Sequence, residues 1–139
     1  MLNGTFSQTM DVKGRMSFPK KLGEIIGEKF VITNGLSGCL FAYSQENFEK
    51  LAEKLEALPL SKGLQVQRYF LAGASDVESD KQGRILVPQH LREFAKLEKE
   101  IVVVGVLDRA EIWEKSKWEE FNSKITEDMI METLEGLDF

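Results

Sequence analysis

The sequence DVKGRMSFPKKL at residues 11–22 occurs a second time, as DKQGRILVPQHL, at residues 80–91. The two copies lie 69 positions apart, and glycine and apolar positions continue to match on both sides of them. Agreement in the same order over about 50 positions indicates a tandem duplication rather than chance. The repeats cover residues 1–55 and 70–125.

Each repeat begins with a short strand that leads into a turn of the form Asp-x-x-Gly-Arg. Gly14 and Gly83 can take the positive φ that a tight turn needs, and Asp11 and Asp80 can accept hydrogen bonds from the backbone that follows them. Such a turn is typical of a hairpin. In both copies the next three residues, MSF and ILV, have the period-two spacing of a strand.

A short helix is expected after each turn. Pro19 and Pro88 suit its first position, because the N–H that proline lacks would be unused there. Its predicted apolar members are Leu22, Ile25 and Ile26 in the first copy and Leu91, Phe94 and Ala95 in the second. Two strands follow, at residues 30–33 and 40–43 in the first copy and at 101–104 and 111–113 in the second.

A longer helix closes each repeat, and Ser44 is a suitable N-cap for the first one. The predicted apolar faces are Phe48, Leu51, Leu55 and Leu58 in the first copy and Trp118, Phe121 and Ile125 in the second. Residues 61–71 show no strand alternation and predict a helix that links the copies. Beyond Thr126 a weak apolar stripe leaves two alternatives open, a docked helix and a mobile end.

These elements predict an α+β fold made of two β-hairpin and short-helix units, flanked by helices. A chain of 139 residues forms one domain, or two very small ones that share a core. We divide it into a first repeat (residues 1–60), a linker helix with the second repeat (61–125) and an acidic C-terminal tail (126–139).

Three features predict a cytoplasmic protein. The N-terminus lacks the basic stretch and apolar run of a secretory signal. No apolar run approaches the roughly 20 residues of a membrane-spanning helix. The lone Cys39 excludes an internal disulfide framework, suits a reducing compartment and is expected to be a small buried residue.

The net charge of −5 argues at first against a nucleic-acid partner. The acidic excess is local, however, because residues 113–139 carry three lysines and eight acidic residues. Residues 1–112 are neutral, with 15 basic and 15 acidic groups. Attraction to phosphate depends on where charge lies as well as on its sum, so DNA binding by the repeats stays open.

The repeated motif carries chemistry that suits DNA. A tight turn projects an arginine from a two-stranded ribbon, which is narrow enough for the major groove. The planar fork of Arg15 or Arg84 matches a guanine edge or a phosphate with two hydrogen bonds, which lysine cannot copy. The candidates for phosphate anchoring are Lys13, Lys20 and Lys21 in the first copy and Lys81 and Arg92 in the second. The two aspartates repel phosphate, so we assign them, with the two turn glycines, to the structure of the turn.

The duplicated Asp-x-x-x-Arg signature, the Arg-x-x-x-Pro spacing after it and the starts of the closing helices at Tyr43 and Trp113 resemble the MraZ family of bacterial regulators. The resemblance covers the chain up to its tail. It implies an AbrB-like swapped-hairpin barrel with pseudo-twofold symmetry, assembly into a closed ring, and binding to short direct repeats in the regulator's own promoter, at the head of a division and cell-wall gene cluster. The matching positions are Asp11, Lys13, Arg15, Asp80, Lys81 and Arg84, although Gln82 is the true counterpart of Lys13. The charge balance is +3 over residues 11–22 and +2 over residues 80–92, so the first copy is the stronger candidate for phosphate contact.

On this basis the expected partners are double-stranded DNA and further copies of the chain. The protein is expected to be nucleoid-associated, with no cofactor, no metal, no membrane contact and no small-molecule substrate.

Two other classes of function stay open. A single Asp-x-x-Gly-Arg is ordinarily a solvated hairpin turn, and duplication would preserve a structural turn as well as a functional one. A ring that acts as a structural or protein-interaction module, without direct DNA readout, is therefore the alternative. An enzyme has less support, because no phosphate loop, metal cluster or triad pattern occurs and a Cys39–His90 pair rests only on the presence of both residues. Tyr43, Phe48, Trp113 and Trp118 are expected in the core rather than on a base-stacking platform.

Overall fold

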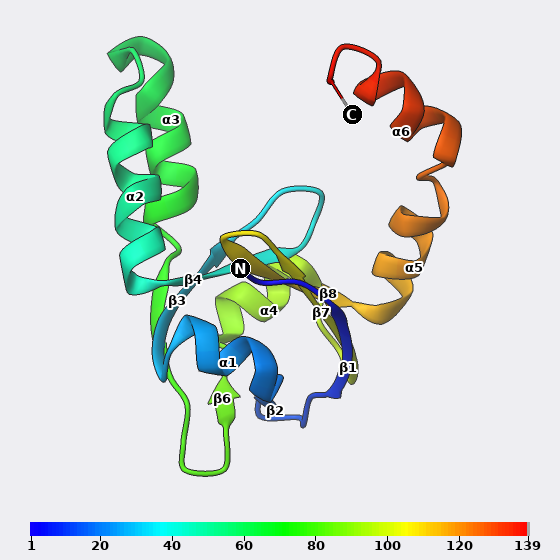
Figure 1. The fold of residues 1–139 in the computed structure, drawn as a ribbon. Coiled ribbons are helices and arrows are strands. Elements are labelled where there is room, and N and C mark those ends of the chain that lie inside the picture. The colour runs from blue at the N-terminus through cyan, green and yellow to red at the C-terminus, as the bar shows by residue number, and fades with distance from the viewer. Residues whose placement is uncertain (139) are drawn as a thin grey trace.

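A computed structural model describes residues 1–138, and it confirms a mixed α+β fold (Figure 1). The first repeat contains β1 (Thr5–Thr9), β2 (Arg15–Ser17), α1 (Lys20–Ile26), β3 (Lys29–Asn34), β4 (Leu40–Ser44) and α2 (Gln45–Glu56). The linking helix is α3 (Leu60–Leu71). The second repeat contains β5 (Ser75–Glu78), β6 (Arg84–Leu86), α4 (Gln89–Ala95), β7 (Glu100–Val106), β8 (Arg109–Glu114) and α5 (Lys115–Ser123), and α6 (Glu127–Leu134) follows.

The strands of the two repeats pair with each other rather than only within each repeat. A six-stranded sheet has the order β1-β7-β8-β4-β3-β5. In this sheet β1 pairs antiparallel with β7 of the second repeat, and β5 pairs antiparallel with β3 of the first. The remaining strands, β2 and β6, pair with each other in a separate two-stranded sheet, which we call the β2–β6 ribbon. Exchanging the equivalent strands of the two repeats (β1 with β5, β3 with β7 and β4 with β8) gives the same strand order, read in the opposite direction.

One hydrophobic core draws on both repeats. It contains the inward-facing residues of the β2–β6 ribbon (Met16 and Ile85), of the two short helices (Leu22, Ile26, Leu91 and Ala95) and of the sheet. Burial of these helix residues confirms four of the six apolar positions expected there. The other two predictions were wrong, since Ile25 is 47% exposed and Phe94 is 36% exposed. Helices of seven residues turn only one narrow face to the core, and Phe94 instead lies edge-on to Tyr69.

A second apolar cluster lies under the longer helices and contains the buried Cys39, Tyr43 and Trp113, with Phe48 and Trp118 packed against it. This placement confirms the core positions expected for these five residues. The Ser44 hydroxyl accepts a hydrogen bond from the Asn47 N–H, which confirms the N-cap. Leu58 and Ile125 lie past the ends of their helices, and with Phe121 they are about 40% exposed, so the predicted apolar faces extend too far.

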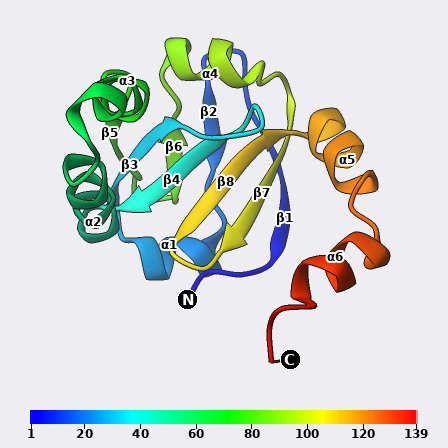
Figure 2. The same cartoon turned by 90° about the horizontal axis from the view of Figure 1, so that it is seen from above.

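The helices form two arms beside the sheet. The pair α2 and α3 lies at one edge of the sheet, and α5 and α6 lie at the other (Figure 2). Of the two alternatives for the tail, the structure shows a helix, which Thr126 caps by accepting from the Met129 N–H. This helix is not docked on the core, because its apolar residues Ile130 and Met131 are 47% and 62% exposed. The last residue of the predicted tail lies outside the described residues.

Candidate nucleic-acid interface

The first turn of the motif, residues 11–15, forms a compact loop that we call the first loop. One carboxylate oxygen of Asp11 accepts hydrogen bonds of 2.9 Å from the N–H groups of Lys13 and Arg15. The Gly14 N–H donates to the Asp11 carbonyl at 3.0 Å, and Gly14 has a φ of +89°, which side chains rarely tolerate. Asp11 therefore shapes the loop that carries Arg15.

The second loop, residues 80–84, repeats this geometry. Asp80 accepts from the N–H groups of Gln82 and Arg84 at 2.9 Å, and Gly83 has a φ of +79°. In each loop the pKa of the aspartate lies below its usual value. The largest cause is the hydrogen bond from the backbone N–H of the arginine, because it favours the charged carboxylate.

The β2–β6 ribbon brings the two loops to one surface. Its register pairs Arg15 with Leu86, Met16 with Ile85 and Ser17 with Arg84. Alternate residues of a strand point to opposite faces, so the buried Met16 and Ile85 define the inner face and both arginines lie on the outer one. Because the strands are antiparallel, the loops project from opposite ends of this ribbon. The guanidinium groups are thus neither buried nor on opposite faces.

The two arginines differ in their contacts. Arg84 Nε lies 3.1 Å from Asp80 Oδ2 and forms an ion pair with it. Within residues 1–138, Arg15 has no ion-pair partner. Within the same residues its guanidinium donates no hydrogen bond to a side chain, so a ligand would not have to displace an ion pair such as that of Arg84.

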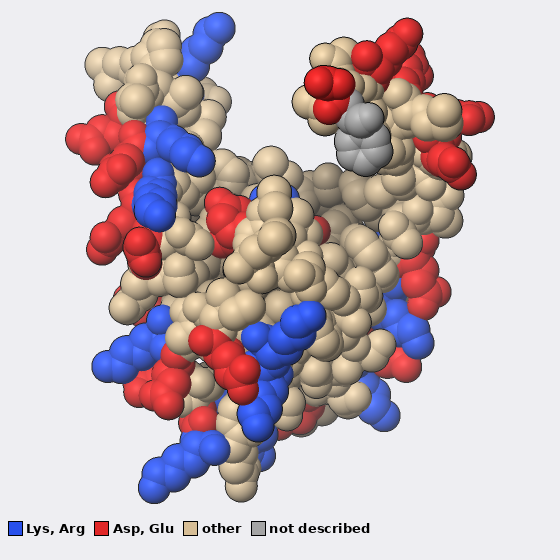
Figure 3. Space-filling view, viewed as in Figure 1, with Lys and Arg blue, Asp and Glu red and all other residues tan. Residues whose placement is uncertain are grey.

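The other predicted basic residues lie around the ribbon. Lys13, Lys20, Lys21 and Lys81 are exposed, and Lys21 Nζ donates to the Asn3 side chain at 2.9 Å. Arg92 is half-buried in α4 and donates from Nε to the Val87 carbonyl at 2.9 Å. In Figure 3, Lys and Arg side chains interleave with acidic ones over the lower part of the molecule, where Figure 1 places the ribbon, whereas the α6 arm is acidic.

Two exposed apolar side chains at this surface escaped the sequence analysis. Val12, at the tip of the first loop, is 96% exposed. Leu86, which pairs with Arg15 across the ribbon, is 49% exposed. For Val12, the one signal in the sequence is an apolar residue at the tip of a polar turn. The place of Leu86 beside Arg15 could be predicted only from the pairing of β2 with β6.

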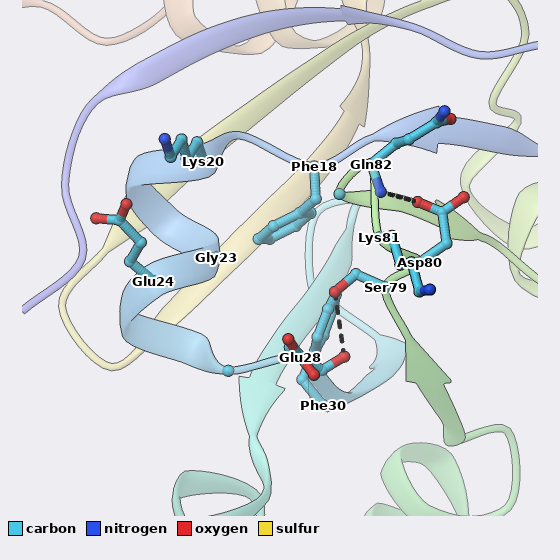
Figure 4. Close-up of a pocket in the computed structure, with 12 residues that line it drawn as sticks. Phe18, Lys20, Gly23, Glu24, Glu28, Phe30, Ser79, Asp80, Lys81 and Gln82 are labelled. Carbon is cyan, nitrogen blue, oxygen red and sulfur yellow. Dashed lines mark hydrogen bonds between the residues drawn. The ribbon is translucent and has the colours of Figure 1, made fainter.

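A pocket of about 610 Å³ lies between α1 and the second loop. Figure 4 shows Lys20 and Glu24 on its α1 side, Asp80 and Gln82 on its loop side, and Phe18 between them. Basic side chains (Lys20 and Lys81) and acidic ones (Glu24, Glu28 and Asp80) both line this pocket.

The remaining polar candidates lie elsewhere. Cys39 is fully buried, and burial raises the pKa of its thiol to about 12, while the thiol donates to the Leu36 carbonyl. His90 is exposed, and its Nε2 lies 2.9 Å from the Gly73 carbonyl oxygen. Among residues 1–138 no group of three or more His, Cys, Asp and Glu side chains could hold a metal ion. No helix in the described part of the chain is both long and apolar enough to span a membrane.

The loop aspartates predict a dependence of stability on pH. A carboxylate whose pKa is lowered by folding stabilises the fold above its unfolded pKa of about 3.8, and this contribution is lost as the pH falls through the folded value. We expect Asp11→Ala to lower the Tm at pH 7, and the difference from the unsubstituted protein to shrink below about pH 4. Thermal unfolding followed by circular dichroism at pH 3 to 7 measures this. A difference that stays constant over that range would contradict the assignment.

Comparison with known proteins agrees with the repeat, because one family model matches the chain twice. The family model described as "MraZ protein, putative antitoxin-like" matches residues 1–67 and 70–138. A protein of Caldanaerobacter subterraneus subsp. tengcongensis named "Transcriptional regulator MraZ" is 51% identical over 99% of this chain and 97% of its own length. Proteins with the same name from Thermoanaerobacter sp. (strain X514) and Acetivibrio thermocellus are 48% and 50% identical, over 99% and 88% of this chain and 99% and 87% of their own lengths.

Proposed function

The chain belongs to the MraZ family, and from that premise we propose that it is a DNA-binding transcriptional regulator that contacts DNA with the outer face of the β2–β6 ribbon. The observation that carries the proposal is the common outer face of Arg15 and Arg84, each at the base of a tight loop. A ribbon of this width enters a major groove, where an arginine fork can recognise guanine. The names of the relatives support regulation of transcription.

The surrounding cations have a separate role in this proposal. Lys13, Lys20, Lys21 and Lys81 contact phosphates, which positions the ribbon without selecting a sequence. The aspartates take no part in contact, because each is engaged with the backbone of its own loop. The proposed target is a set of short direct repeats in the promoter of the protein's own gene, at the head of a division and cell-wall gene cluster.

We further propose that the subunits assemble into a closed ring and that the protein works in the cytoplasm, on the nucleoid. The two helical arms present exposed apolar residues, among them Leu60, Met129 and Met131, which supports contact between subunits. A ring presents many copies of the ribbon, so that weak contacts to spaced repeats add through effective concentration. The AbrB-like barrel remains part of this proposal, supported by the exchange of strands between the repeats.

A titration against salt tests the proposal. Binding to a labelled duplex from upstream of the gene should exceed binding to a scrambled duplex of equal composition, and should weaken steeply between about 50 and 200 mM salt. A ring that only joins proteins would show neither the preference nor the salt dependence. Analytical ultracentrifugation of the same protein measures assembly separately, so loss of DNA binding with an intact ring would favour that alternative.

A further inference from the structure

The two loops share one backbone geometry but differ in what supports them. A Cβ placed on Gly14 would lie 2.5 Å from Arg92 Nε and 2.9 Å from the Val87 carbonyl oxygen, so the second repeat packs directly on this glycine. A Cβ on Gly83, the equivalent residue of the second loop, would meet no atom of residues 1–138 within 4 Å. Among residues 1–138, only the first loop therefore has atoms packed against the Cβ position of its glycine.

Arg92 is linked to the first loop through the backbone of Val87. Its Nε donates to the Val87 carbonyl at 2.9 Å, and the Val87 N–H donates to the Gly14 carbonyl at 2.9 Å. The Val87 carbonyl is thus bound by the Arg92 side chain, and the Val87 N–H is bound by the first loop. The half-buried position of Arg92 keeps its side chain beside Gly14 rather than extended into solvent.

The other repeat has the same backbone contact without the side chain. The Phe18 N–H donates to the Gly83 carbonyl at 3.0 Å, as Val87 does to Gly14. The residue at the position of Arg92 in α1 is Gly23, and the pocket between α1 and the second loop lies where an arginine would extend (Figure 4). The second loop instead holds its own arginine in the Asp80–Arg84 ion pair.

We infer that Arg92 is a positioning residue, which holds the first loop in the conformation that presents Arg15, and that the two loops of a subunit are therefore not equivalent. The inference rests on the proposed function. A loop ordered before binding loses less conformational entropy on contact, so the first loop is the one suited to reading a defined base. The second loop must release Arg84 from Asp80 and adapts to the DNA.

Two substitutions at Arg92 separate positioning from phosphate contact. Arg92→Gln removes the charge but keeps an N–H donor at the chain position of Nε, whereas Arg92→Lys keeps the charge and moves the donor one atom further out. Positioning predicts that Gln replaces Arg and that Lys does not. Phosphate contact predicts the reverse, because phosphate binding depends on charge.

Hydrogen exchange of the free protein, followed by mass spectrometry, tests the positioning role without DNA. Residues 11–15 should exchange about 3- to 10-fold more slowly than residues 80–84 in the unsubstituted protein. Arg92→Ala and Arg92→Lys should remove this difference, and Arg92→Gln should preserve it. Equal exchange of the two loops before any substitution, or protection retained by Lys and lost with Gln, would overturn the inference.

Binding to the upstream duplex gives the second measurement. Arg92→Lys and Arg92→Ala should weaken binding roughly 3- to 10-fold, while Arg92→Gln should stay within about twofold with an unchanged salt slope. A salt slope smaller by about one in the Gln variant would instead identify a phosphate contact and overturn the inference. If the unsubstituted protein fails to bind DNA, the proposed function is wrong. The exchange measurement still tests whether Arg92 holds the first loop in place.

The converse test places an arginine at Gly23, the position of the first repeat that is equivalent to Arg92. Outside the backbone of α1 itself, a Cβ on Gly23 would have Phe18 Cδ2 as its one neighbour among residues 1–138 within 4 Å, at 3.8 Å. Gly23→Arg can therefore be accommodated and can extend into the pocket towards Gly83. Exchange of residues 80–84 should then slow to the rate of residues 11–15. A folded Gly23→Arg protein whose second loop exchanges as before would contradict the role assigned to this position.

Discussion

Replacement of Arg15 by alanine should weaken binding to the upstream duplex by about 1–3 kcal/mol per recognised base and leave the fold unchanged. Arg15 is exposed and has no ion-pair partner within residues 1–138, so its removal deprives no buried group of a contact. The loss falls on DNA binding because the arginine fork supplies two directed hydrogen bonds to one base edge. Fluorescence anisotropy measures the affinity, and circular dichroism checks the fold.

Two further variants test whether the loss comes from the arginine fork and whether the two loops contribute equally. Arg15→Lys keeps the charge but not the fork, so it should lose sequence preference more than affinity for a scrambled duplex. Arg84→Ala should cost less than Arg15→Ala, because Arg84 must first leave Asp80, which lies 3.1 Å away. A correctly folded Arg15→Ala protein with unchanged binding would remove the proposed role of this side chain.

Replacement of Gly105 by alanine should destabilise the fold by about 2–3 kcal/mol. A Cβ at this position would lie 2.5 Å from the Asn3 nitrogen and 2.8 Å from the Asn3 oxygen, which are backbone atoms and cannot move aside alone. The Gly105 N–H also donates to the Gly4 carbonyl at 2.8 Å, so the methyl group would force apart the segment that precedes β1. The buried Leu2 would move with it.

Urea unfolding of Gly105→Ala beside Gly136→Ala measures this cost. Gly136 is a suitable control, since a Cβ there would meet no atom of residues 1–138 within 4 Å and its backbone is not in the left-handed region. The control should unfold at the midpoint of the unsubstituted protein. Equal midpoints for both variants would show that the start of the chain is not held against β7 in solution.

Local features were predictable because their interactions are local. The Asp-x-x-Gly-Arg pattern predicts the turn, since Asp11 bonds to N–H groups only two and four residues ahead. Ser44 likewise caps a helix through a residue three positions on. The β3 and β7 strands are nearly continuous apolar runs, and the structure extends the predicted bounds by one or two residues. The exposed Ile25 and Phe94 show that in a short helix the spacing of apolar residues does not predict which of them are buried.

Contacts between the repeats could not be predicted in this way, because they join residues far apart in the chain. Two repeats with the same alternation could pair their strands within each copy or across copies, and period-two patterns do not distinguish the partners. Only the tertiary structure showed that β2 pairs with β6 and that both arginines therefore share an outer face. The same holds for Arg92, whose contact with Gly14 joins residues far apart in the chain.

By itself the sequence determined that the chain is duplicated, which residues form each turn and where charge accumulates. The tertiary structure alone decided that both turns belong to one ribbon, with their arginines on one face, and that they are supported unequally. The physical reason is that a turn is stabilised by hydrogen bonds among neighbours, whereas pairing and packing across about 70 residues depend on how all the apolar faces of the chain are buried together.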